Sequence, residues 1–160
     1  KTGMASGDNP DTAETFEGFV FNKNYDVAML LFNHFVGQFD IFRTSSDIKK
    51  DSNSSGQPDI ESISNVIYFA PSAQWRWTEK WGMNFRFAYA VLQEKPAQHS
   101  EAASDVGTEF DFGVAYKPYP RLNWSSDIGL LVPGAAFKSG TMDYESNFAF
   151  ALSTRVGISF

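Results

Sequence analysis

Charged and amide side chains recur at alternate positions along several segments of the chain. Glu109 and Asp111 are two residues apart, with Phe110 between them and Phe112 beyond. Successive side chains of a β-strand point to opposite faces, so the two carboxylates share one face and the two phenylalanines the other. Applied to every segment that alternates in this way, the pattern gathers one set of polar residues on a single face. The set comprises Gln74, Arg76, Asn84, Arg86, Glu109, Asp111, Lys117, Asn123, Asp127 and Arg155.

Two kinds of chemistry fit such a face if the sheet rolls up around it. Charges that leave water are costly unless they pair or stay hydrated. The first interpretation is a lattice of salt bridges that fills a small closed lumen. The second is a water-filled channel in which arginines attract anions while carboxylates set a transverse field. The arginines would be Arg76, Arg86 and Arg155, and the carboxylates Glu109, Asp111 and Asp127. The number of strands decides between the two.

Residues suited to catalysis or metal binding are sparse. The two histidines, His34 and His99, fall in an apolar stretch and in a polar loop, and the local sequence pairs neither with a serine nucleophile. Asp8, Asp11 and Glu14 offer oxygen ligands for calcium, but turn capping is the simpler role for them. We therefore expect no enzyme, no cofactor and no metal site.

Composition narrows the class of protein further. The chain has 160 residues, which predicts a single domain over residues 1–160, and it has no cysteine. Its formal net charge of -6 argues against a nucleic-acid partner. Nowhere does it approach the eighteen consecutive apolar residues of a membrane helix, which excludes a helical membrane protein. A transmembrane barrel escapes that test because only alternate residues face lipid.

The last fourteen residues carry the clearest strand pattern. One alternate set is mostly apolar: Phe148, Phe150, Leu152, Thr154, Val156, Ile158 and Phe160. The other set is small or polar: Asn147, Ala149, Ala151, Ser153, Arg155, Gly157 and Ser159. A tilted strand that crosses a bilayer needs roughly 9–11 residues. The segment is therefore long enough to cross.

The same alternation predicts four further strands, over residues 65–77, 81–93, 106–117 and 122–132. Pro71 lacks an amide donor, so we expect an irregularity in the first of these. The connections differ in length. Short turns are expected at Thr78–Lys80 and 118–121, and long loops near 43–62, 94–105 and 133–143.

The first third of the chain is harder to interpret. Residues 14–22 alternate weakly and could form a strand. The apolar run Val27–Phe32 lies within residues 25–42, which we expect to form a strand that continues outward, the alternative being a short helix in a barrel mouth. Residues 1–7 would be at most an abbreviated strand. The chain would then hold about eight strands, or the C-terminal strands of a larger barrel. We favour the larger barrel because an open sheet edge cannot persist in lipid.

These features resemble those of bacterial outer-membrane β-barrels. Ile158 and the terminal Phe160 match the C-terminal strand that the barrel-assembly machinery of this family recognises. The alternation of short turns with long loops is also typical of such barrels. Aromatic residues crowd the short-turn side, as an interfacial girdle requires: Trp75, Trp77, Trp81, Tyr116, Tyr119, Trp124 and Phe160. The resemblance implies an all-β, antiparallel up-and-down transmembrane barrel in the outer membrane, in contact with lipid, lipopolysaccharide and that machinery.

A weaker resemblance concerns the N-terminal region. Residues 5–42, which include the stretch ASGDNPDTAETFEGFVFNKNYDVA, look like the external-loop region of alginate-export-type porins. This implies a pore for anionic sugars or for solutes in general. We therefore expect a channel for small or anionic solutes whose pore-lining residues are the polar set above without Asn123. The alternative is a small closed barrel with a structural, adhesive or partner-binding role through its external loops. Either way, the remaining strands of a larger barrel or another chain could be needed.

Overall fold

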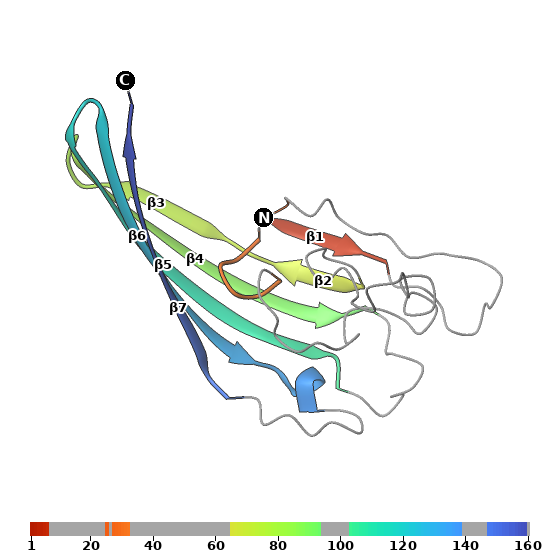
Figure 1. The fold of residues 1–160 in the computed structure, drawn as a ribbon. Helices are drawn as coiled ribbons and strands as arrows, with labels where there is room; N and C mark the ends of the chain where they lie inside the picture. The colour runs from red at the N-terminus through yellow and green to blue at the C-terminus, as the bar shows by residue number, and fades with distance from the viewer. Residues whose placement is uncertain (7–24, 26, 33–64, 94–102, 139–146, 160) are drawn as a thin grey trace, which may run out of the picture.

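The computed structural model describes residues 1–6, 25, 27–32, 65–93, 103–138 and 147–159. It consists of β-strands and one short 3-10 helix (Figure 1). The strands are β1 (Thr2–Ala5), β2 (Val66–Phe69), β3 (Ser72–Arg76), β4 (Trp81–Leu92), β5 (Asp105–Tyr119), β6 (Leu122–Pro133) and β7 (Ala149–Ile158), and the 3-10 helix η3 spans Ala135–Lys138. No helix of the described residues is long and apolar enough to cross a membrane.

The strands form one antiparallel sheet in the order β1-β2-β4-β5-β6-β7, and β3 also pairs with β4. β2 and β3 are two halves of one line of chain, separated at Ala70 and Pro71. The register with β4 continues across the gap, and the carbonyl oxygen of Pro71 still accepts a hydrogen bond from the amide of Phe87 at 3.1 Å. The irregularity predicted at Pro71 is therefore confirmed, and its cause is the missing amide hydrogen.

The long strands follow the predicted segments closely. β4, β5, β6 and β7 each begin and end within two residues of the expected bounds. The β3–β4 and β5–β6 turns are short, and both lie at the same end of the sheet as the end of β7 (Figure 1). We call this end the short-turn end, and the opposite end the loop end. The all-β antiparallel architecture expected from the sequence is confirmed.

Within the described residues the sheet is open, with β1 and β3 along one edge and β7 along the other. Closure into a barrel is thus absent from the part of the chain that the structure describes. β1 pairs directly with β2, with Thr2 opposite Phe69. No other strand therefore lies between β1 and β2 in the sheet. Residues 14–22 themselves lie outside the described residues.

The expectation of a strand or a helix over residues 25–42 is wrong for the part that is described. Tyr25 and residues 27–32 contain only bends and a turn, and Phe32 has a positive φ of 83°. Val27, Ala28, Leu30, Leu31 and Phe32 are nevertheless buried. The continuous apolar run reflects packing against the sheet, which buries this irregular backbone without pairing it as a strand.

The two faces of the sheet differ as the alternation predicts. One face, here called the apolar face, carries large exposed side chains, among them Phe150 and Leu152, which are 71% and 70% exposed. The opposite face, here called the charged face, carries Glu109 and Asp111, of which 0% and 9% of the surface is exposed. At the loop end of the charged face, residues 27–32 pack on small and apolar side chains of β2, β4 and β5 to form the core.

Candidate functional site

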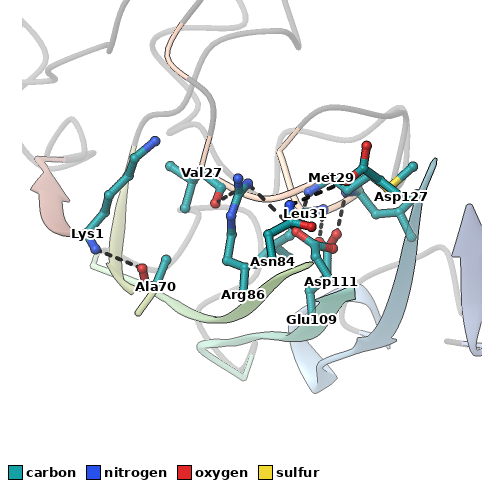
Figure 2. Close-up of polar contacts among 11 residues, drawn as sticks. Lys1, Val27, Met29, Leu31, Ala70, Asn84, Arg86, Glu109, Asp111 and Asp127 are labelled. Carbon is teal, nitrogen blue, oxygen red and sulfur yellow. Dashed lines mark hydrogen bonds and ion pairs between the residues drawn. The ribbon is translucent and has the colours of Figure 1, made fainter. Parts of the chain in front are cut away.

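Residues 27–32 lie across the charged face and are bound to it by carboxyl groups of β5. The amide of Leu30 donates a hydrogen bond to Oε1 of Glu109 at 2.6 Å, and the amide of Leu31 donates to Oε2 of the same residue (Figure 2). The amide of Met29 donates to Oδ2 of Asp111 at 3.2 Å. Three consecutive amides thus point toward two carboxyl groups, an arrangement that satisfies backbone donors that no β-ladder pairs.

Arg86 on β4 completes this attachment. Its Nη1 donates a hydrogen bond to the carbonyl oxygen of Val27 at 3.0 Å and lies 3.7 Å from Oδ2 of Asp111 (Figure 2). Arg86 and Asp111 are register partners on neighbouring strands, so the sheet itself sets their separation. The guanidinium group of Arg86 therefore binds both Asp111 on the sheet and the backbone of residues 27–32.

Beside this segment the charged face is hollowed toward the short-turn end. The hollow has a volume of about 770 Å³. Seven of the nine predicted pore-lining residues line it together: Gln74, Arg76, Asn84, Arg86, Asp111, Asp127 and Arg155. They come from five strands, β3 to β7, so the antiparallel register is what gathers them.

The other two predicted residues lie elsewhere. Glu109 is on the expected face, but residues 30 and 31 cover it completely and it does not line the hollow. Lys117 is exposed near the short-turn end and lines a smaller recess of about 230 Å³ together with Arg76. For Glu109 the reason is the apolar run at 27–32, whose placement over the sheet the sequence pattern does not reveal.

Asn84 and Asp127 meet across Gly113 in the hollow. Nδ2 of Asn84 lies 3.4 Å from Oδ1 of Asp127, and the two residues sit on the strands on either side of Gly113. A Cβ atom at Gly113 would collide with Oδ1 of both side chains. Glycine is therefore required for this contact, since any side chain would fill the space that the bridge occupies.

The charges of the face are separated along the strands rather than across them. Glu109, Asp111 and Asp127 lie in successive rows of the register counted from the loop end. Arg76 and Arg155 occupy the next row toward the short-turn end, in line with Gly82, Ala115 and Ser125. Of the three arginines, only Arg86 lies level with a carboxylate of the described strands, Asp111.

Several lining residues were missed by sequence reasoning. Met29, Ser125 and Ser153 all line the hollow. Ser125 and Ser153 belong to the polar alternate sets of β6 and β7, so the alternation could have identified them. Met29 could not be found in this way because it reaches the hollow from an irregular segment. The sequence held only an indirect signal for this segment. Glu109 and Asp111 share one face of β5, and carboxyl groups that become buried there need hydrogen-bond donors from another part of the chain.

The remaining predicted features are the C-terminal residues, the histidines, the acidic cluster and the aromatic girdle. Ile158 is 64% exposed at the end of β7, whereas Phe160 lies outside the described residues, as do His34, His99 and the acidic residues 8, 11 and 14. Among the residues that the structure describes, no group of three or more histidine or acidic side chains could hold a metal ion. Of the aromatic residues near the short-turn end, Tyr116 and Trp124 are half-buried and four are exposed: Trp75, Trp77, Trp81 and Tyr119. Trp75 and Trp77 stack with ring centroids 6.5 Å apart.

Comparison of the chain with protein-family models, with curated proteins and with solved structures gives no match.

Proposed function

We propose that this chain forms part of a bacterial outer-membrane β-barrel, a porin-like channel through which small or anionic solutes pass along the charged face. The observation that carries the proposal is the sidedness of the sheet. Val156 and Ile158 on the apolar face are each 64% exposed, while Glu109 on the other face is fully buried. Contiguous exposed apolar surface on this scale is rare on proteins bathed in water and is what hydrocarbon requires.

Strand length and connection length support the same proposal. β4, β5, β6 and β7 have 12, 15, 12 and 10 residues, against the roughly 9–11 that a tilted transmembrane strand needs. The short connections gather at one end (Figure 1). In outer-membrane barrels that end faces the periplasm. The exposed tryptophans near it fit the interfacial belt where amphipathic rings are favoured.

The sheet has open edges, which a bilayer does not tolerate. Unpaired amides and carbonyls along β1, β3 and β7 have no water partners in a bilayer, so a membrane-embedded sheet must close on itself or on further strands. In our proposal, further strands of a larger barrel or of another chain pair with these two edges. The hollow beside residues 27–32 would then be part of an aqueous lumen.

A second candidate is a closed barrel with a structural, adhesive or partner-binding role through its loops. The observation that favours it is the packing of residues 27–32, which fill the loop end of the charged face with a dry core. If that filling extended across the whole lumen, no solute could pass, and the loops would be left as the functional surface.

Ion conductance separates the two candidates. The folded, full-length protein is reconstituted into planar lipid bilayers, and stable current steps are expected for a channel. Insertion is checked independently by flotation of the protein with liposomes. A protein that inserts but carries no current would overturn the channel and leave the closed barrel.

A further inference from the structure

The carboxyl groups of the charged face already have partners. Glu109 accepts hydrogen bonds from the amides of residues 30 and 31, and Asp111 accepts one from the amide of Met29 and lies beside Arg86. Asp127 is in contact with Asn84. Glu109 and Asp111 are thus engaged in attaching residues 27–32 to the sheet, whereas Asp127 lines the hollow beside the neutral side chain of Asn84.

The cations nearer the short-turn end are in a different situation. Arg76, Lys117 and Arg155 form no ion pair with any residue that the structure describes. Arg76 and Arg155 both line the hollow. Lys117 lies two residues beyond Ala115 on β5, one step further toward the short turns. The hollow is lined by three arginines and two aspartates, and the smaller recess by Arg76, Lys80 and Lys117 with Glu79, so positive side chains outnumber negative ones in both.

The residues between the two arginines leave room for a ligand. The register row runs from Arg76 through Gly82, Ala115 and Ser125 to Arg155. Four strand spacings separate its ends, which is about 19 Å measured along the sheet. The three intervening side chains are small, so the arginines stand at the two ends of a shallow strip.

We propose that this row, with Lys117 beside it, is the anion-selecting segment of the lumen. Its ligands are small solutes that carry carboxylate or phosphate groups, because the guanidinium fork binds both in a bidentate manner. Positively charged walls raise the local concentration of anions and lower that of cations. Arg86 is not part of the segment, since its charge is paired within the attachment of residues 27–32. The inference rests on the proposed channel function.

The test measures the reversal potential of the reconstituted channel across a potassium chloride gradient. The wild-type protein is expected to prefer chloride over potassium. A unit charge several ångströms from the ion path attracts anions with an electrostatic energy that salt partly screens. Each lost arginine should therefore reduce the chloride-to-potassium permeability ratio by about threefold. Arg76→Gln with Arg155→Gln should therefore reduce it by about ninefold.

Matched variants make the outcome specific. Arg76→Lys with Arg155→Lys keeps both charges and should keep the chloride preference. Arg121→Gln removes the same charge from the β5–β6 turn, outside the hollow, and should change the ratio by less than either arginine of the row. Strand content by circular dichroism shows that each variant is folded. Current with no chloride preference, or an unchanged ratio in the double glutamine variant, would overturn the inference alone. Absence of current in the wild type would overturn the channel itself and the inference with it.

Discussion

Glu109 shows how one side chain determines the position of a distant segment. Its carboxyl group is fully buried and accepts hydrogen bonds from two amides that are 79 and 78 residues away in the chain. Buried backbone donors are costly when they lose their acceptor, at about 1–3 kcal/mol each. The contribution of Glu109 to stability therefore exceeds that of an ordinary polar residue on the sheet.

We predict that Glu109→Ala lowers the free energy of unfolding by about 2–6 kcal/mol, because it leaves the amides of residues 30 and 31 without acceptors. Glu109→Gln keeps one acceptor oxygen and should lower it by roughly half as much. Urea unfolding of the refolded protein, followed by tryptophan fluorescence, measures both. Asp127→Ala is the control: it removes a carboxylate from the same face, where the contact with Asn84 is long at 3.4 Å, and its effect should be below about 1 kcal/mol. Equal losses for Glu109→Ala and Asp127→Ala would contradict this account.

At the scale of elements, residues 27–32 and β6 are close enough to be joined covalently. A Cβ atom built at Gly129 would lie 3.2 Å from Cβ of Met29, a few tenths of an ångström inside the roughly 3.5–4.5 Å of disulfides, so a small outward shift of the segment would suffice. The chain has no cysteine, so an engineered pair would have no competing thiols. The geometry thus permits a direct test of whether this segment rests on β6 in the folded protein.

We predict that Met29→Cys with Gly129→Cys forms an intramolecular disulfide under mild oxidation, detected as loss of both free thiols in a thiol assay and in the mass of the intact chain. Met29→Cys with Gly157→Cys is the matched control, because no atom lies within 4 Å of a Cβ built at Gly157. It should retain both thiols under the same conditions. Persistent thiols in the first pair, or equal oxidation of the two pairs, would place residues 27–32 elsewhere.

The elements differ in how far the sequence predicts them, and the physical reason is the origin of their stability. β4 to β7 alternate apolar and polar residues because each has one face exposed and one face turned to the hollow, and this local pattern fixes their bounds within two residues. Residues 27–32 have no such pattern. Their amides are satisfied by side chains of β5 about eighty residues away, and no local signal encodes that pairing. The site was predictable where it lies on strands and unpredictable where residues 27–32 cover it.

At the scale of the whole molecule, the surroundings of the sheet determine which of its two faces water can reach. Leu152 on β7 is 70% exposed, and its neighbour Ser153 is partly buried and lines the hollow. In a protein surrounded by water, a thiol at position 152 would be the more accessible of the two. In a membrane barrel with a wet lumen, acyl chains would cover position 152, and water would reach position 153.

We therefore predict that, in liposomes, a small water-soluble maleimide labels Ser153→Cys several times faster than Leu152→Cys. The two positions are adjacent on one strand, so differences in local folding cannot account for a reversed order of rates. Unfolding both variants in urea provides the control, because their thiols should then react at equal rates. Faster labelling of Leu152→Cys in the folded, lipid-reconstituted protein would show that the apolar face meets water, and the membrane assignment would fail together with the channel that depends on it.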